Sequence, residues 1–441
     1  MAQTDTRDGP IMRRIPSAQT AIILPIKTIN PRLAVVCIAA ASVGLSMAII
    51  SVAKFLLLLC GLLALFFNFW STNKDQPALK AYTPVAILTV ILSFAASLLW
   101  SIAPEADALG SVAKYGKLLV VVLILYLIRN RREALCALCA FMGAQIFLLV
   151  SSWLLFFQVP LPWATSNMAL TQYAVFSSYL DQGIMSSVLA ALCWHLRSLM
   201  PGRFGRHAAV VFALVALSNV FFILSGRTGH VVAIALVSLA IMWELPKKYR
   251  AAVVAVPFLL ALLLFVSSSK VRDRLTLVKT EVQSYSTQTA STTSSGIRLG
   301  LWRSAVDIIG QHPIAGAGVG SWSTEHNRLQ RSHNPAHIDI QGNGNPHQEY
   351  LLWGVQLGVP GILLFIGLML SVWRDTQSMP LLYSRSTQSV LAALAVACLF
   401  NSSIYDALIG DFFCIAIGLF LALGLQQPKP EDERPTPRFA T

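Results

Sequence analysis

Runs of about 17 to 20 mostly apolar residues recur along the whole of this 441-residue chain. A run of that length crosses a bilayer as a helix, because backbone groups in lipid must pair within their own segment. Charged residues make up 12% of the chain, whereas soluble domains carry about 25%. The sequence therefore predicts an all-α polytopic membrane protein with about twelve transmembrane helices. The predicted spans are 33–50, 54–70, 83–101, 111–128, 134–157, 180–196, 208–224, 230–245, 251–268, 349–373, 387–403 and 411–425.

The net charge of +13 follows the orientation rule for membrane proteins, so no nucleic-acid partner is expected. If the basic N-terminus is cytoplasmic, thirteen Lys and Arg residues lie in cytoplasmic connections and four in short loops on the opposite side. The cytoplasmic set is Lys74, Lys80, Arg129, Arg131, Arg132, Arg197, Arg203, Arg206, Lys247, Lys248, Arg250, Arg374 and Arg385, and the opposite set is Lys54, Lys114, Lys117 and Arg227.

One large polar segment interrupts the apolar runs, and on this topology it is periplasmic if the source is a Gram-negative bacterium. It contains a Ser/Thr/Gln tract (284–295) without helical or strand period. A helix is predicted over 296–309, where apolar residues recur every three to four positions, and a Gly-rich turn over 316–322. The expected organisation is a cytoplasmic N-terminal segment (1–32), transmembrane helices 1–9 (33–268), a large periplasmic loop (269–346), transmembrane helices 10–12 (347–425) and a cytoplasmic tail (426–441).

Two arginines are candidate anion-binding groups. Arg227, in SGRTG, is the only basic residue of its short outer loop and precedes an apolar helix. Its charge and the free N–H groups at that helix N-terminus together suit a phosphate, although an interfacial anchor that reaches lipid headgroups is the alternative. Arg298 lies four residues before Trp302, on the same face of the predicted loop helix, and either binds what lies beneath the loop or is a surface charge.

His347 stands where the long polar segment meets the next apolar run, in GNPHQEYL, and is expected in the first turn of that helix. The positive helix end lowers the pKa of a nearby histidine and keeps the ring neutral, as a general base requires. A polar capping residue is the alternative, and Glu349 could be a partner or a competing base. Pro335 separates His333 from His337 and argues against a helical metal pair, so no metal site is predicted.

Motifs for nucleotide or cofactor binding are absent from the sequence: it has no P-loop, no G-x-G-x-x-G at a strand–helix junction and no Asp-x-Asp. Glu105 and Asp107 are a weak candidate for a carboxylate pair. No cofactor is expected, and an anionic leaving group would be stabilised by arginines. A lipid-linked pyrophosphate fits this prediction, because its lipid would lie in the bilayer beside the helices.

Three patterns, in order and on one predicted side, resemble the O-antigen ligase/polymerase family of bacterial integral membrane glycosyltransferases. They are SGRTG (225–229), R-x-x-x-W followed by HPIAGAGVGSW (298–322), and HQEYLLWGVQLGVPG (347–361). The resemblance covers most of the chain and is clearest from about 205 to 375. The length and the single large loop look most like the O-antigen ligases, which implies a GT-C-type fold.

The resemblance implies an active-site histidine at His347 and two arginines, Arg227 and Arg298, that bind the donor pyrophosphate. It also suggests that Asp181 and Gln182, in SSYLDQG, line the site. The implied reaction moves an undecaprenyl-pyrophosphate-linked O-antigen polysaccharide to a sugar hydroxyl of lipid A–core, without metal, at the periplasmic face of the inner membrane, and inverts an α-linked donor.

Three alternatives remain for the reaction. A polymerase of the same family would join repeat units to one another, and a protein O-oligosaccharyltransferase would glycosylate a protein. A lipid-linked oligosaccharide transporter would more naturally carry charged or broken helices at mid-membrane.

Overall fold

A computed structural model describes residues 30–70, 81–267, 294–333, 335, 338–341 and 344–426. The N-terminal segment to residue 29, most of the Ser/Thr/Gln tract and the tail from 427 lie outside the described residues. The described residues form helices and turns with no strand, which confirms the all-α fold class.

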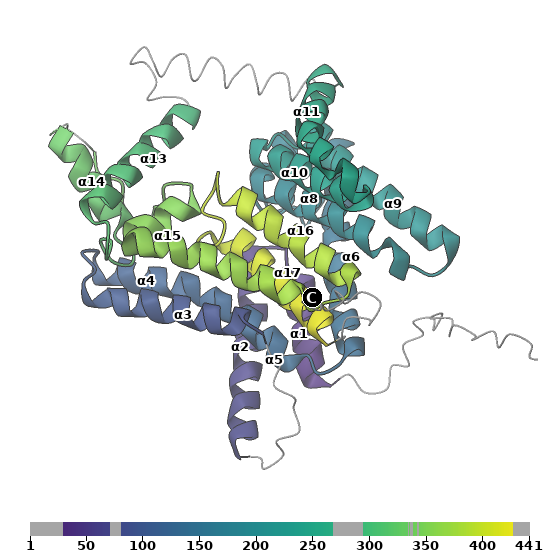
Figure 1. Cartoon of the computed structure of the whole chain (residues 1–441), viewed down its shortest axis with the longest axis horizontal. Coiled ribbons are helices and arrows are strands. Elements are labelled where there is room, and N and C mark those ends of the chain that lie inside the picture. Colours follow the sequence, from purple (N-terminus) through teal and green to yellow (C-terminus); the bar gives the residue numbers. More distant parts are fainter. Residues whose placement is uncertain are drawn as a thin grey trace, which may run out of the picture.

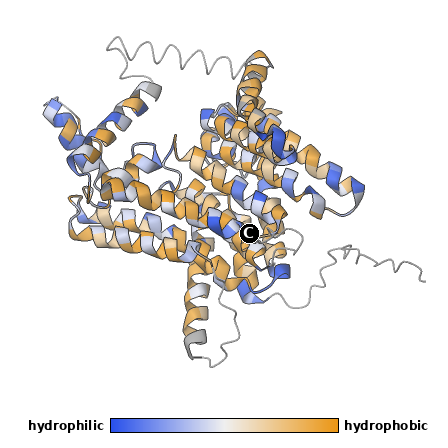
Figure 2. Cartoon of the chain, in the orientation of Figure 1, coloured by the Kyte–Doolittle hydropathy of each residue, from blue (hydrophilic) through white to orange (hydrophobic). Residues whose placement is uncertain are grey.

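Seven described helical segments are long and apolar enough to cross a membrane, and two shorter apolar helices, Pro31–Ser42 and Thr83–Leu99, accompany them (Figure 2). The chain is therefore a multi-pass membrane protein, while the total of twelve spans stays a prediction. The seven segments are Met47–Phe66, Glu105–Leu127, Arg131–Phe156, Gly202–Ile223, Arg227–Glu244, Glu349–Thr376 and Ala407–Leu425.

Helical structure overlaps every predicted span (Figure 1). The α-helices described are α1 (Pro31–Ser42), α2 (Met47–Trp70), α3 (Thr83–Ala96), α4 (Glu105–Tyr115), α5 (Leu119–Leu127), α6 (Arg131–Phe156), α7 (Ala169–Gln172), α8 (Tyr179–Leu196), α9 (Gly202–Ser218), α10 (Arg227–Glu244), α11 (Val256–Ser267), α13 (Ser294–Gln311), α14 (Trp322–His333), α15 (Glu349–Thr376), α16 (Leu381–Ala397) and α17 (Ala407–Leu425).

The break between the first two helices differs from the prediction. α1 ends at Ser42, and the chain turns at Gly44, whose φ of 84° lies in the left-handed region that favours glycine. The predicted break near Lys54 is wrong, because Lys54 lies inside α2 and its ammonium pairs with Asp411 of α17 at 2.7 Å. A charge that is paired within the bundle does not require a loop.

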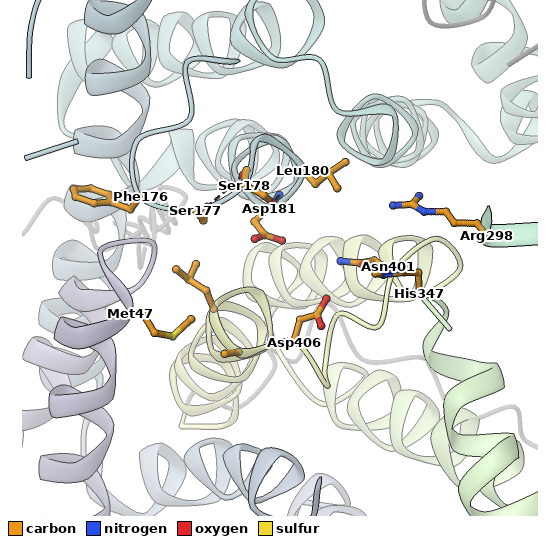
Figure 3. Close-up of a pocket in the computed structure, with 12 residues that line it drawn as sticks. Met47, Phe176, Ser177, Ser178, Leu180, Asp181, Arg298, His347, Asn401 and Asp406 are labelled. Atoms are coloured by element: carbon orange, nitrogen blue, oxygen red, sulfur yellow. Dashed lines mark hydrogen bonds between the residues drawn. The ribbon is translucent and has the colours of Figure 1, made fainter. Parts of the chain in front are cut away.

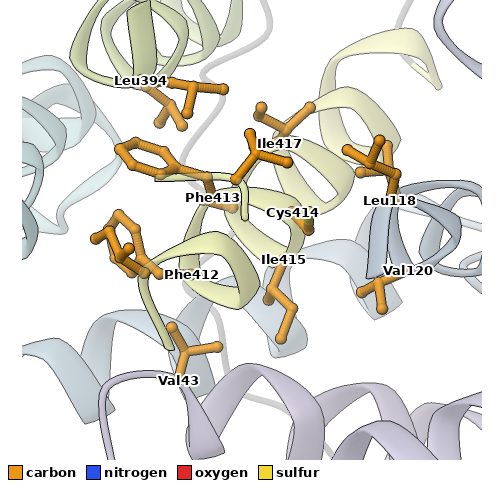
Figure 4. Packing of buried hydrophobic residues seen from close by; sticks show 14 of the residues in the cluster. Val43, Leu118, Val120, Leu394, Phe412, Phe413, Cys414, Ile415 and Ile417 are labelled. Carbon is orange, nitrogen blue, oxygen red and sulfur yellow. The ribbon is translucent and has the colours of Figure 1, made fainter. Parts of the chain in front are cut away.

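α17 forms the centre of the bundle. Of its most apolar stretch, 94% of the residues are buried, against 22% in α2. Figure 4 shows Phe412 and Phe413 of α17 surrounded by apolar side chains of other elements. At Gly418 the helix approaches α5 so closely that an added Cβ would lie 3.2 Å from the Cα atom of Val121. Small residues allow such close contact in membranes, where van der Waals packing joins the helices.

α8 and α10 are also joined through glycines. An added Cβ at Gly229 of α10 would lie 3.0 Å from the Cα atom of Gly183 in α8, and one at Gly226 would lie 3.2 Å from the carbonyl oxygen of Tyr179. The hydroxyl of Ser187 donates a hydrogen bond to the Gly229 carbonyl at 3.2 Å. The first turn of α10, with Arg227, therefore lies beside the first turn of α8.

α15 is interrupted at Gly358, whose φ is 70°. Pro360 has no N–H, so the carbonyl of Gln356 lacks its usual helical partner. The N–H of Val359 also leaves the helical pattern and donates to the carbonyl of Pro313 at 2.8 Å. The interruption thus frees backbone carbonyls in the middle of a helix.

The predicted Gly-rich turn takes up these carbonyls. The N–H of Ala317 donates to Val355 at 2.8 Å, and that of Gly318 donates to Gln356 at 3.0 Å. Gly316 has a φ of 66°, and an added Cβ there would lie 2.4 Å from the carbonyl carbon of Gln356. These contacts fix the turn between α13 and α14 against α15, and α13 and α14 lie at one side of the bundle (Figure 1).

Candidate functional site

A cavity of about 370 Å³ lies where several helices begin (Figure 3). Its size is at the lower end of the ~300–1,000 Å³ usual for ligand sites. α8 and α17 start at its wall, and α15 starts two residues after His347. Helix N-termini carry partial positive charge, so their convergence favours an anion. The lining residues are Met47, Phe176, Ser177, Ser178, Leu180, Asp181, Arg298, His347, Asn401, Asp406, Ala407 and Leu408.

The sequence predicted His347 in the first turn of α15, but this residue precedes the helix, which begins at Glu349. The N-cap of α15 is Gln348, whose side chain accepts from the N–H of Leu351. His347 itself has a left-handed φ of 53°, and its N–H donates to the side-chain oxygen of Asn345 at 2.8 Å. This Asn-mediated turn moves the imidazole out of the helix and into the cavity.

The surroundings of His347 lower its pKa. Burial is the largest cause and the positive charge of Arg298 the next, while Asp406 and a hydrogen bond with Asn401 act in the opposite direction. The direction agrees with the prediction from the sequence, but the main cause is loss of water rather than the helix dipole. The ring is therefore neutral near pH 7 and can accept a proton.

Arg298 and Arg227 form the arginine side of the site. Figure 3 shows the Arg298 side chain extending from α13 toward the cavity, near His347. Burial, and secondly the charge of Arg227, lower the pKa of Arg298, so the two guanidinium groups lie within electrostatic reach of each other. Arg227 is not among the residues that line the cavity. Two cations that repel each other are suited to a multiply charged anion such as a pyrophosphate.

Asp181 and Asp406 form the carboxylate side. Both line the cavity, from the first turn of α8 and from the N-cap of α17 (Figure 3). The Asp406 carboxylate accepts a hydrogen bond from the side chain of Asn345 at 3.2 Å. Burial raises the pKa of Asp406, while electrostatic interactions with protonated His347, Lys117 and Lys114 oppose this rise. Asp406 thus shares Asn345 with the backbone of His347.

Asp406 and Asn401 were not identified from the sequence. One local signal was available for Asp406, since an aspartate directly before an apolar run is a typical helix N-cap. Asn401 had no such signal, because its place beside His347 depends on how the connection between α16 and α17 folds back.

Glu349 was predicted as a partner of His347 or a competing base, but it lies behind the cavity wall and does not line the cavity. Its fully buried carboxylate accepts from the indole N–H of Trp353 at 2.8 Å and from the backbone N–H groups of Ile404 and Tyr405 at 2.9 and 3.1 Å. The carboxylate oxygens of Glu349 therefore accept hydrogen bonds from protein groups and do not face the cavity.

Gln182 is likewise buried and does not line the cavity. It accepts from the N–H of Val175 at 2.9 Å and donates to Ser152 and to the carbonyl of Tyr173 at 2.8 and 3.1 Å. It holds the segment that continues into the cavity wall at Phe176.

The other candidates lie elsewhere. Glu105 and Asp107 are in the first turn of α4, where they complement the helix dipole. His333 ends α14, and His337 lies outside the described residues. Within the described ranges, no group of three or more His, Cys, Asp and Glu side chains is arranged to hold a metal ion.

Comparison with known protein families gives a match to part of the chain. Residues 212–366 match the family model described as O-Antigen ligase. The matched segment contains Arg227, Arg298 and His347, and ends before Asn401 and Asp406. No curated protein matches the chain.

Proposed function

We propose, from the premise that residues 212–366 belong to the O-antigen ligase family, that the chain is a glycosyltransferase with a polyprenyl-pyrophosphate-linked glycan donor. The supporting observation is that one cavity contains His347, whose pKa is lowered, and the half-buried guanidinium of Arg298, with a second guanidinium, Arg227, close by. The proposed donor is undecaprenyl-pyrophosphate-linked O-antigen. The proposed acceptor is a sugar hydroxyl of lipid A–core.

In the proposed reaction, the neutral imidazole of His347 takes the proton of the acceptor hydroxyl. The hydroxyl oxygen bonds to the anomeric carbon of the donor, and the bond from that carbon to the pyrophosphate oxygen breaks with its electron pair on the oxygen. Arg227 and Arg298 neutralise the charge that grows on the leaving pyrophosphate, which is preorganised electrostatic stabilisation. Asp406 stabilises the imidazolium that forms, since its charge favours protonated His347. Direct displacement inverts an α-linked donor, and the scheme uses no metal.

The proposed location is the bacterial inner membrane, with the cavity at the periplasmic face. The apolar helices give the lipid of the donor a bilayer environment beside the cavity. In this arrangement the chain between α11 and α15 is the large periplasmic loop, and the GT-C-type fold remains an expectation from the family.

The first test is a gel of lipopolysaccharide from a strain that lacks the gene, complemented with wild type or with His347→Ala. For a ligase, the knockout shows bare core while long polymer accumulates on the lipid carrier, and His347→Ala fails to restore the ladder at normal expression. Core that carries a single repeat unit would identify a polymerase instead. Transfer by purified protein in detergent, where no two sides exist, would exclude a transporter.

A further inference from the structure

Two of the cavity-lining residues, Asn401 and Asp406, lie on the connection between α16 and α17, residues 398–406, here called the 398–406 loop. The first residue of this loop is tied to the start of α15, because the N–H of Glu349 donates to the carbonyl of Cys398 at 3.0 Å. The loop therefore connects the helix that follows His347 to the helix that begins after Asp406.

Two buried ionisable side chains hold the end of this loop. The carboxylate of Glu349 accepts from the backbone N–H groups of Ile404 and Tyr405 at 2.9 and 3.1 Å. The ammonium of Lys117 donates to the carbonyls of Asp406 and Tyr405 at 2.7 and 3.3 Å. Glu349 thus binds backbone N–H groups of this stretch, and Lys117 binds its backbone carbonyls.

Neither side chain lines the cavity, and both are buried, with 0% exposure for Glu349 and 8% for Lys117. Ionisable groups at such depth are expensive, and they persist where they have a specific task. Here both Lys117 hydrogen bonds and two of the three Glu349 hydrogen bonds go to the backbone at and just before Asp406, and the third joins Glu349 to Trp353.

We propose that Glu349 and Lys117 are positioning residues, which hold the 398–406 loop so that Asn401 and Asp406 face His347. The inference rests on the proposed function, in which Asp406 acts on the proton-accepting histidine. It assigns Glu349 a role different from the partner or competing base considered from the sequence.

Gly410 provides an independent way to disturb the same contact. An added Cβ there would lie 2.6 Å from the carbonyl oxygen of Ile404 and 2.9 Å from the ammonium of Lys117. Gly410→Ala therefore displaces the loop or the lysine without removing any charge. Lys117→Met removes both hydrogen bonds to the loop and keeps most of the side-chain length.

Lys114→Met is the matched control. Lys114 stands one helical turn before Lys117, and its ammonium lies 3.9 Å from the ring centre of Tyr405. It also influences Asp406 through its charge. The control removes one positive charge near Asp406 and leaves the two Lys117 hydrogen bonds in place.

The readout is the pH profile of glycan transfer by purified full-length protein, with melting temperature measured in parallel. Arg298, Asp406 and Asn401 are the groups that shift the pKa of His347. Asp406 raises this pKa, so withdrawal of Asp406 lowers it, and neutral His347 then persists to lower pH. In Lys117→Met and Gly410→Ala, the acidic limb of the profile should move to lower pH, as in Asp406→Asn, and kcat should fall about tenfold to a hundredfold.

The outcomes separate the inference from the proposed function. A folded Lys117→Met or Gly410→Ala protein with an unchanged acidic limb and near-normal kcat would overturn the positioning role. If Lys117→Met does not fold, Gly410→Ala decides. If the acidic limb of the pH profile moves equally in Lys114→Met, the shift arises from the loss of a positive charge near Asp406. That result would also overturn the positioning role. An Asp406→Asn protein whose acidic limb is unchanged would instead refute the assignment of His347 as base.

Discussion

The two charged sides of the cavity are built differently. On the arginine side, Arg227 stands at the start of α10 within the bundle. Arg298 lies on α13, which is fixed to the bundle by the docking of the 316–320 turn against the interrupted helix α15. The carboxylate side belongs to the bundle itself, since Asp181 and Asp406 stand at the starts of α8 and α17. On the proposed function, one of the two groups that neutralise the donor, Arg298, is therefore docked onto a scaffold that already contains Arg227 and the groups around the proton acceptor.

The largest expected effect belongs to His347, which lies between the two sides. His347→Ala should lower the transfer rate of purified protein by about 10²- to 10⁴-fold, because the acceptor hydroxyl loses its proton acceptor. His207→Ala, at an exposed position at the start of α9, is the control and should keep its rate. A rate loss below tenfold in a folded His347→Ala protein would make the histidine an orienting group at most.

The arginine side is tested by Arg298→Lys. A lysine keeps the charge but lacks the planar fork that binds two phosphate oxygens, so kcat/KM for the donor should fall about tenfold to a hundredfold. Arg303→Lys, exposed on the same helix, should have little effect. Near-normal kinetics of Arg298→Lys would show that charge alone suffices on this side.

The carboxylate side is tested by Asp406→Asn. The negative charge of Asp406 raises the pKa of His347, so its removal lowers that pKa, and activity should extend to lower pH. The rate at the optimum should fall by about tenfold, because the imidazolium loses a stabilising charge, equivalent to ~1.4 kcal/mol. The pH profile of Glu105→Gln, an exposed carboxylate on α4, should match wild type.

The docking that distinguishes the two sides is tested by Gly318→Ala. Gly318 has a φ of 87°, and an added Cβ would lie 2.3 Å from the Cα atom of Ser101, so the turn must shift. We expect a severalfold higher KM for the donor with an unchanged KM for the acceptor, because the shifted turn connects directly to α13, which carries Arg298. Gly300→Ala, where an added Cβ contacts nothing within 4 Å, is the control. Equal changes in both KM values would mean that the two sides are not independent.

The sequence predicted the parts of the site that have local patterns. SGRTG, the helical period around Arg298 and the polar-to-apolar change at His347 can each be read from a few neighbouring residues. Asp181 was found through the resemblance alone. Asn401 and Asp406 were missed because their relation to His347 is tertiary, set by the return of the chain between α16 and α17.

For the fold, the sequence likewise predicted local features but not the packing of the helices. Hydropathy located helices at all the expected places, but it did not distinguish α2, which is mostly exposed, from α17, which is mostly buried. Both are strongly apolar, and only packing separates them. The ion pair between Lys54 and Asp411 also could not be predicted from neighbouring residues. Because of this pair, Lys54 lies inside α2, where the sequence predicted a loop.

The central position of α17 has a consequence for biosynthesis. Of the described helices, α17 is the last to leave the ribosome, although the others pack around it. The earlier helices are therefore inserted in the membrane before α17 is present. Until then, the surfaces that α17 later covers are exposed to lipid or to chaperones. A stop codon shortly before residue 407 would remove the middle of the molecule rather than its edge.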